Sequence, residues 1–236
     1  MIQTRPVDYR DGDTVLKGWM AWDDELPGAR PGVLVAHAWS GQTDFERGKA
    51  TRLAELGYVG FALDNYGDGK NGSTREENAA LLQPFLDDRG ALQRRMKLAL
   101  DCLLEQPEVN QAAAIGFCFG GLSVLDLARS GASLAGVVSF HGLLGAPDNT
   151  EGTPITTPIL VLHGWDDPMA TPDQVVALAE ELSGAGADWQ LVGYGGTVHA
   201  FANPNANDPE YGTVYSKAAD RRSWQAMENF LRDIFA

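Results

Sequence analysis

The alternation of short apolar runs with amphipathic segments most constrains what this chain can fold into. Runs with the pattern of strands are expected at residues 3–10, 14–22, 32–38, 59–66, 112–118, 134–142, 158–165 and 188–195. Segments with helical spacing are expected at residues 45–58, 75–106 (interrupted near 87–90), 119–129, 172–183 and 215–235. Apolar strands alternating with helices are typical of a mostly parallel sheet with helices on both faces. No repeat or linker divides this pattern, so we predict a single α/β domain over residues 1–236.

Composition limits the partners and the compartment. The net charge of −14 disfavours nucleic acid and anionic membrane surfaces, since both would repel the protein. The first residues lack a signal-peptide pattern, and no apolar stretch is long enough to cross a bilayer. The two cysteines, Cys102 and Cys118, are no disulfide framework, and Cys102 lies in an apolar helical stretch typical of a buried core. We therefore expect a cytoplasmic protein, a monomer or small homo-oligomer, with no nucleic-acid or membrane partner.

The strand expected at 112–118 ends in the motif G-F-C-F-G-G (116–121), which allows two interpretations. A dinucleotide-binding turn requires G-x-G-x-x-G, but Cys118 stands at the middle glycine and would block the approach of pyrophosphate. A nucleophile elbow requires glycines two residues on either side of the nucleophile, so that the strained turn avoids collisions. The following helix directs its N-terminus at the thiol and favours thiolate. The motif favours an elbow, although a buried cysteine in a tightly packed turn has the same pattern.

An elbow predicts an acid and then a histidine, each on a loop that follows a later strand. The strand at 158–165 leads to Asp166 and Asp167, and the strand at 188–195 leads to His199. Open α/β sheets build their sites at such carboxyl ends of strands. The three positions in this order predict nucleophilic catalysis by Cys118, with one of the two aspartates orienting His199.

Several motifs resemble the dienelactone hydrolase family of α/β-hydrolases over nearly the whole chain. They are G-F-C-F-G-G (116–121), L-H-G-W-D-D-P (162–168), V-H-A-F-A-N-P (198–204), H-A-W-S-G (37–41) and D-N-Y-G-D-G (64–69). The resemblance implies an α/β-hydrolase fold of about eight strands, with no metal or organic cofactor. It also implies Cys118 as nucleophile, His199 as base and Asp167 as orienting acid, because the family's acid follows the loop glycine by three positions. Asp166 is the alternative acid.

The same resemblance implies how the reaction proceeds. The N–H of Phe119 and an N–H from the loop after 32–38, that of Trp39 or of its neighbour Ala38, would stabilise the oxyanion. Attack by the thiolate on an ester carbonyl forms a thioester, which water activated by His199 then hydrolyses. The expected partner is a small-molecule ester or lactone.

Departures from the family pattern concern the substrate pocket. Ala38 stands where the family carries a glutamate, while Asp68 and Asn203 stand where it carries arginines that bind the substrate's carboxylate. We therefore expect neutral esters or lactones rather than the anionic dienelactone. The residues expected at the pocket are Ala38, Tyr66, Asp68, His141, Trp165, Phe201 and Asn203. His37 and His163 also follow strands and are expected to be structural.

Other functions stay open at this point. The alternatives are a true dienelactone (carboxymethylenebutenolide) hydrolase, an acyl thioesterase or transferase on the same triad, and a ligand receptor without catalysis. An oxyanion hole stabilises charge on an oxygen bound to carbon or to phosphorus. We therefore also predict slow hydrolysis of activated phosphotriesters, which carry no negative charge for Asp68 to repel.

Overall fold

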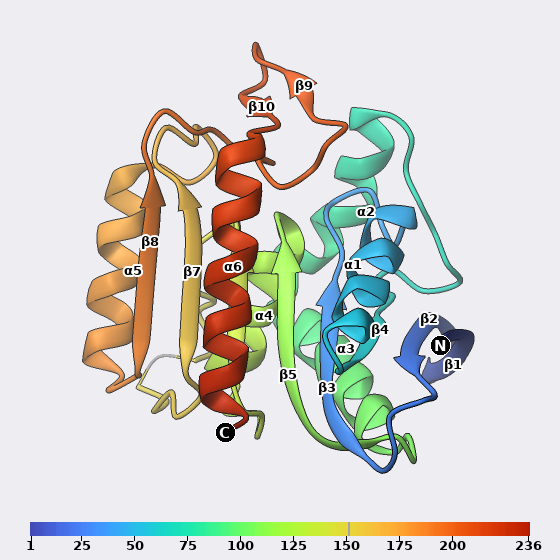
Figure 1. The fold of residues 1–236 in the computed structure, drawn as a ribbon. Helices are drawn as coiled ribbons and strands as arrows, with labels where there is room; N and C mark the ends of the chain where they lie inside the picture. The colour runs from blue at the N-terminus through green and yellow to red at the C-terminus, as the bar shows by residue number, and fades with distance from the viewer. Residues whose placement is uncertain (151) are drawn as a thin grey trace. The chain divides into compact units, whose positions relative to one another are not determined.

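Strands and helices alternate along the chain in the computed structural model, which describes residues 1–150 and 152–236 (Figure 1). The chain divides into two units, Met1–Ile115 (the first unit) and Gly116–Ala236 (the second unit). The single domain over residues 1–236 therefore stays a prediction. No helix among the described residues is both long enough and apolar enough to cross a membrane.

Five strands and three helices begin in the first unit. Its strands, in the order β1-β2-β4-β3-β5, are β1 (Ile2–Asp11), β2 (Thr14–Asp23), β3 (Arg30–Ala36), β4 (Val59–Ala62) and β5 (Val109–Phe117, which ends in the second unit). Its helices are α1 (Asp44–Glu55), α2 (Arg75–Asp87) and α3 (Arg89–Leu104). β1, β2 and β4 pair antiparallel, whereas β3 and β4 run parallel, with Val33 opposite Gly60.

Capping side chains explain where the helices of the first unit begin. Thr43 and Glu46 form a reciprocal capping box at α1, and Thr74 and Glu77 form another at α2. Asp88 ends α2 and caps the start of α3 with its carboxylate. The interruption expected in the long helical stretch is therefore confirmed.

The second unit contains three parallel strands in the order β6-β7-β8, besides the end of β5. Its described elements are α4 (Phe119–Arg129), β6 (Val137–Phe140), β7 (Ile159–Gly164), α5 (Pro172–Gly184), β8 (Trp189–Tyr194), β9 (Asn207–Asp208), β10 (Thr213–Val214) and α6 (Lys217–Ile234). The closing helix α6 buries the apolar side chains Trp224, Met227, Phe230 and Leu231. This apolar stripe matches the amphipathic pattern of its sequence.

A buried arginine holds helix α4 in the second unit. The Arg129 guanidinium donates to both carboxylate oxygens of Glu181 on α5, each at 2.7 Å, and to the carbonyl of Leu144 at 2.9 Å. It also contacts Asp126 one turn earlier, at 3.2 Å. Bidentate, charge-assisted bonds of this kind are strong and directional. They fix the helix whose first turn follows Cys118.

Eight strands in these orders, most of them parallel, confirm the fold class expected from the sequence. The strand expected at 59–66 is too long, because β4 ends at Ala62. Beyond it the Asp64 carboxylate accepts the backbone N–H groups of Tyr66, at 2.9 Å, and Gly67, at 2.8 Å, and turns the chain. The short hairpin of β9 and β10 was not expected.

Candidate active site

Cys118 lies between β5 and α4 in a backbone conformation that few residues other than glycine adopt. Its φ is 56° and its ψ is −115°. Three hydrogen bonds hold it there. Its N–H donates to the carbonyl of Phe140 at 3.1 Å, and its carbonyl accepts the N–H of Gly121 at 2.9 Å and that of Leu122 at 3.3 Å. The thiol is partly exposed, at the N-terminal end of α4. Strain, anchoring and partial exposure are typical of a side chain presented for chemistry.

Two of the glycines beside Cys118 are required by close packing. A Cβ on Gly116 would collide with the carbonyl oxygen of Gly120, and a Cβ on Gly121 would lie 2.6 Å from the Cα of Gly142. Neither position can hold a side chain without moving backbone. The glycine pattern around Cys118 is therefore a packing requirement of the strand-to-helix turn.

His199 and Asp167 form a buried pair in the second unit. Nδ1 of His199 lies 2.7 Å from Oδ2 of Asp167, and both side chains are almost fully buried. Oδ1 of Asp167 accepts the N–H of Met169 at 2.8 Å, so both carboxylate oxygens are engaged. Nε2 of His199 has no hydrogen-bond partner among the described residues. The pair therefore orients the ring and leaves one nitrogen available for proton transfer.

The loops that carry the pair are joined by their backbones. The N–H of Asp166 donates to the carbonyl of Thr197 at 3.0 Å, and a Cβ on Gly164 would lie 2.7 Å from that same oxygen. Asp166 itself is exposed, whereas its neighbour Asp167 is buried against His199. The fold thus gives two adjacent aspartates opposite environments.

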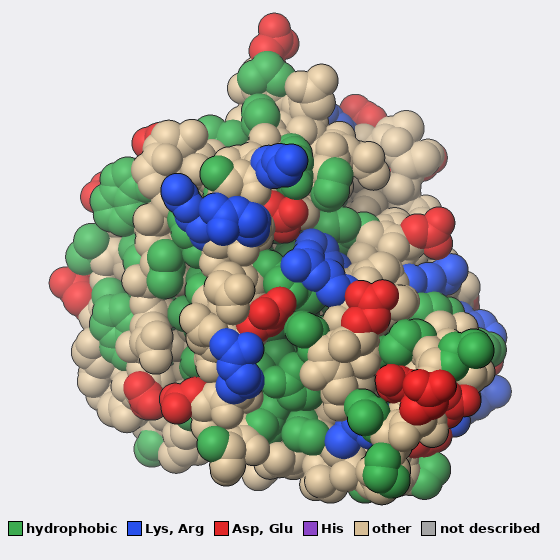
Figure 2. Space-filling model, viewed as in Figure 1, with side chains coloured by type: hydrophobic (Ala, Val, Ile, Leu, Met, Phe, Trp, Pro, Cys, Tyr) green, Lys and Arg blue, Asp and Glu red, His purple; other side chains and the backbone are tan. Residues whose placement is uncertain are grey.

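The electrostatics of His199 differ from those of an ordinary histidine. Burial of the ring disfavours its charge, but the negative charge of a Cys118 thiolate and the bond to Asp167 outweigh burial. Together they raise the pKa of His199 to about 10. Figure 2 shows no histidine on the face that it presents, and all four histidines are buried. The ring is therefore shielded from solvent.

Aromatic rings surround His199. His141, with a φ of 37°, has its ring centroid 5.2 Å from that of His199 and 5.0 Å from that of Phe201. His163 is fully buried, and burial lowers its pKa, which disfavours the charged ring. Trp165, by contrast, is 43% exposed. Of the pocket residues expected in this unit, His141 and Phe201 lie at the candidate base.

Asn203, the remaining pocket candidate of the second unit, makes hydrogen bonds within its own turn. Its side-chain oxygen accepts the N–H of Asn205 at 3.0 Å, and its own N–H donates to the carbonyl of Ala200. These bonds shape the turn that follows Phe201. The side chain of Asn203 is half-buried.

The other predicted residues belong to the first unit, where the loop after β3 is internally braced. The N–H of Ala38 donates to Oε1 of Glu46 at 3.3 Å, and the carbonyl of Trp39 accepts the Tyr66 hydroxyl at 2.8 Å. His37 accepts the N–H of Asn65 on Nε2 at 3.1 Å, a structural use of the ring. The loop is therefore held by side chains from two neighbouring segments.

Asp68 is exposed on the surface of the first unit. Its φ is 57°, and its carboxylate lies 3.4 Å from the ammonium group of Lys70. More than half of each side chain is open to water, where such an ion pair contributes little. The charge of Asp68 is thus partly balanced by its neighbour.

Two supporting features were missing from the sequence interpretation. Glu46 accepts the N–H of Ala38 while it caps α1, and the T-x-x-E pattern of Thr43 and Glu46 was a signal that could have found it. The hairpin of β9 and β10, which pairs with His199, has strands of two residues, too short for a periodic signal.

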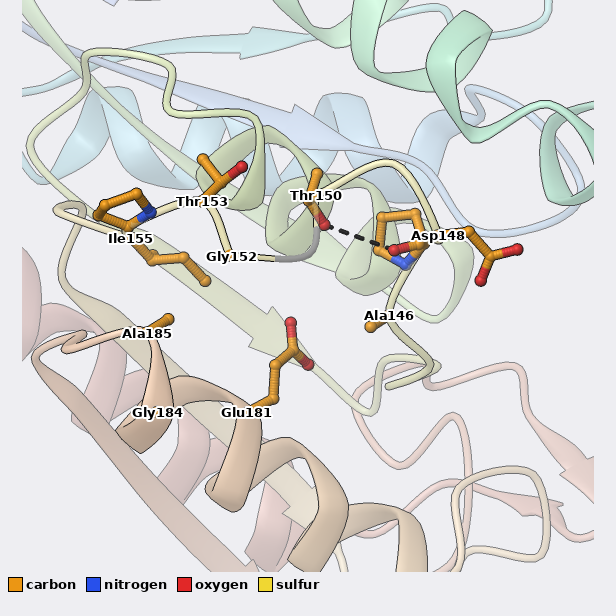
Figure 3. Close-up of a pocket in the computed structure, with 11 residues that line it drawn as sticks. Ala146, Asp148, Thr150, Gly152, Thr153, Ile155, Glu181, Gly184 and Ala185 are labelled. Carbon is orange, nitrogen blue, oxygen red and sulfur yellow. Dashed lines mark hydrogen bonds between the residues drawn. The ribbon is translucent and has the colours of Figure 1, made fainter.

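A cavity of about 450 Å³ lies elsewhere in the second unit, between the loop after β6 and the end of α5 (Figure 3). Its described lining includes Asp148, Thr150, Ile155 and Glu181. The Glu181 carboxylate on its wall is already taken by Arg129. None of Cys118, Asp167 and His199 is among the described lining residues, so this cavity carries none of the candidate chemistry.

Comparison with known sequences identifies the family. The sequence model of the dienelactone hydrolase family matches residues 17–235. A Caenorhabditis elegans protein, described as uncharacterized, is 35% identical over 158 residues, which cover 64% of this chain and 98% of that protein. A Yersinia pestis protein, named provisionally as a carboxymethylenebutenolidase, is 25% identical over 224 residues, which cover 90% of this chain and 81% of that protein.

Comparison with solved structures agrees. The crystal structure of a dienelactone hydrolase-like promiscuous phosphotriesterase from metagenomic libraries is 38% identical, with a TM-score of 0.95. The match covers 100% of this chain and 99% of that one. The chain therefore belongs to the dienelactone hydrolase family of α/β-hydrolases and is a hydrolase that acts on ester bonds.

Proposed function

We propose that this enzyme hydrolyses neutral carboxylic esters and lactones with Cys118 as nucleophile, His199 as base and Asp167 as orienting acid. One observation carries the proposal: Nδ1 of His199 is bound to Asp167 at 2.7 Å while Nε2 is left without a hydrogen-bond partner among the described residues. Such a buried ring, held at one nitrogen and available at the other, is the arrangement that nucleophilic catalysis requires.

Acylation begins when Nε2 of His199 takes the proton of the Cys118 thiol. The Cys118 thiolate attacks the ester carbonyl carbon, and the new C–S bond turns the carbonyl oxygen into an oxyanion. When the oxyanion collapses, the C–O bond to the alcohol breaks and the His199 imidazolium donates its proton to the leaving oxygen. Asp167 stabilises the imidazolium throughout, since its carboxylate raises the pKa of His199.

Deacylation regenerates the enzyme. Once Cys118 is acylated, it no longer carries the negative charge that favours protonated His199. Neutral His199 takes a proton from water, and the hydroxide attacks the thioester carbonyl. The C–S bond then breaks, the carboxylic acid leaves, and the departing Cys118 thiolate takes back the proton that His199 holds.

Two backbone N–H groups are proposed to stabilise the oxyanion. The first belongs to Phe119, which directly follows Cys118 at the positive end of α4. The second is assigned by family resemblance to Trp39 rather than Ala38. Donation of the Ala38 N–H to Glu46 supports that choice, because this group is already engaged.

The substrate class follows from charge. Asp68 and Asn203 replace the two arginines with which the family binds a carboxylate, so no cation in these positions favours an anionic substrate. Tyr66, His141, Trp165 and Phe201 supply aromatic surface to the proposed pocket. The lack of metal and cofactor, the cytoplasmic location and the oligomeric state stay predictions from the sequence.

A side-by-side assay tests the proposed function. Wild-type enzyme is given a neutral aryl ester, a neutral lactone and an anionic dienelactone, and the kcat/KM values are compared. We expect the neutral substrates to be preferred and Cys118→Ala to abolish turnover of all three. A preference for the anionic lactone, or full activity of Cys118→Ala, would contradict the proposal.

A second activity, slow hydrolysis of activated phosphotriesters, is favoured by the 38% identical relative described as a promiscuous phosphotriesterase. The Cys118 thiolate would attack phosphorus, form a P–S bond and expel the aryl oxide. A neutral triester carries one P=O oxygen for the N–H donors and no negative charge for Asp68 to repel. Because thiolate is a better leaving group than alkoxide, water can then release the phosphorylated cysteine.

Release of aryl alcohol over time tests this activity, with an aryl dialkyl phosphate in excess over enzyme. We expect many turnovers per enzyme at a rate well below that of the best ester. A single stoichiometric burst that leaves Cys118 permanently phosphorylated would contradict turnover.

A further inference from the structure

The hairpin of β9 and β10 binds both the backbone N–H and the backbone carbonyl of His199. The N–H of His199 donates to the carbonyl of Gly212 at 3.0 Å, and its carbonyl accepts the N–H of Val214 at 3.2 Å. Two residues on, the carbonyl of Phe201 accepts the N–H of Ser216 at 3.1 Å. In Figure 1 the hairpin extends beyond the carboxyl ends of β7 and β8, from which the loops of the pair emerge. The position of His199 therefore depends on the hairpin.

The hairpin also packs against the loop that carries Asp167, and the contact is made at Gly212. Gly212 has a φ of +74°, and a Cβ there would collide with Cγ of Pro168 and lie 2.9 Å from its Cδ. Pro168 directly follows Asp167. The backbone of Gly212 thus lies against a rigid ring, and no side chain fits between them.

These contacts close a circuit. It passes from the His199 ring to the Asp167 carboxylate, along the chain to Pro168, across to Gly212, and back to the backbone of His199 through the 3.0 Å hydrogen bond. We propose that Gly212, packed on Pro168, is a positioning residue that sets the distance between His199 and Asp167. This inference rests on the proposed function of that pair.

The circuit has chemical consequences because the bond between His199 and Asp167 is short and buried. A displacement of about 1 Å in such a site can lower the rate roughly 100-fold, since proton transfer depends steeply on geometry. The bond also helps to raise the pKa of His199, so a longer bond lowers that pKa. A contact with only a structural role would change neither quantity.

Three variants and a matched control test the proposal. Gly212→Ala introduces the collision, Pro168→Ala removes the ring, and the double variant tests whether removing the ring relieves the collision. Gly186→Ala is the control, because Gly186 has a φ of +72° and open space where its Cβ would lie. It imposes the same backbone strain without a collision. Each purified variant is checked for folding by circular dichroism, assayed for kcat/KM on a neutral aryl ester, and titrated by NMR at the His199 ring.

We expect Gly212→Ala to lose about tenfold or more in kcat/KM and to lower the pKa of His199, because the pair separates. Adding Pro168→Ala should recover part of both losses, a non-additive result. Equal behaviour of Gly212→Ala and Gly186→Ala, or no recovery in the double variant, would overturn the positioning role. If wild-type turnover does not depend on Cys118, the proposed function fails instead, and the His199 titration alone decides the inference.

Discussion

Each unit of the molecule buries a histidine and an aspartate beyond the ends of its strands, but the two units use them differently. In the first unit, His37 accepts the N–H of Asn65 at 3.1 Å. The Asp64 carboxylate accepts four backbone N–H groups at 2.8–3.0 Å, those of Lys17, Tyr66, Gly67 and Gly69. These side chains bind backbone and fix a loop.

In the second unit, the side chains bind each other. Asp167 holds Nδ1 of His199 at 2.7 Å, and Nε2 has no hydrogen-bond partner among the described residues. Burial is the same in both units, so burial does not distinguish a structural histidine from a catalytic one. The distinction lies in which partner each ring nitrogen has. Hydrogen bonds to backbone are typical of structural rings, whereas one carboxylate and one available nitrogen are typical of catalysis.

Loss of the nucleophile or the base should have the largest effect. We expect Cys118→Ala and His199→Ala to lower kcat/KM on a neutral aryl ester by at least about 1,000-fold, because members of one catalytic unit fail together. Both variants should stay folded by circular dichroism. Cys102→Ala is the matched control, since Cys102 is buried in α3 and should leave the rate unchanged. If Cys102→Ala were inactive and Cys118→Ala active, the nucleophile would be Cys102 and not Cys118.

The next largest effect should come from Asp167, and its neighbour Asp166 should have almost none. Asp167→Asn should lower kcat/KM on the order of 1,000-fold, because an amide neither fixes the same tautomer nor stabilises the imidazolium. It should also lower the pKa of His199, which NMR titration measures directly, since the Asp167 carboxylate helps to raise it. Asp166→Asn, at an exposed position, should stay within about twofold of wild type. The reverse order would assign the acid to Asp166.

Asp64, the buried aspartate of the first unit, should affect the stability of the fold rather than the catalytic rate. Asp64→Asn directs an amide N–H₂ at backbone donors, and losing such buried bonds should lower the free energy of unfolding by about 1–3 kcal/mol. Urea unfolding measures this loss. Folded Asp64→Asn enzyme should keep its kcat/KM within about tenfold of wild type. If Asp64→Asn were fully stable and as inactive as Asp167→Asn, Asp64 would have a catalytic rather than a structural role, and the contrast between the units would be wrong.

The smallest effect should come from charge in the proposed pocket. Asp68→Arg and Asn203→Arg, made singly and together, restore the cations of the family pattern. Because an exposed charge contributes up to about 1 kcal/mol, we expect roughly a fivefold shift in kcat/KM toward anionic lactones relative to neutral esters. Asp188→Arg adds an exposed cation at the amino end of β8 and serves as the control. An unchanged ratio in all three Arg variants at 68 and 203 would remove these positions from the pocket.

Much of the fold could be predicted because β3, β6 and β7 are buried apolar runs and several helices begin at capping residues. The interruption at Asp88 is one example, since this residue ends one helix and caps the next. Strand β4 ends at Ala62, before the predicted end at residue 66, because the Asp64 carboxylate turns the backbone by accepting the N–H of Tyr66. The strands β9 and β10 could not be predicted, because two residues show no periodicity.

The candidate site was predictable in residue type but less so in geometry. The order of Cys118, the two aspartates and His199 predicts the chemistry, yet only family resemblance favoured Asp167 over Asp166. The burial of one aspartate and the exposure of the other depend on backbone bonds between the two loops, which no local pattern encodes. The packing of Gly212 on Pro168 likewise joins residues far apart in the chain.

The central claim is that Cys118 forms a covalent thioester during ester hydrolysis. The most direct test mixes enzyme with an excess of a neutral p-nitrophenyl ester, quenches the reaction in acid within milliseconds, and measures the intact mass and the modified peptide. We predict an added acyl group on Cys118, absent from Cys118→Ala and lost again as substrate is exhausted. Turnover without any acylated enzyme, or an acyl group on another residue such as Ser123, would contradict the account.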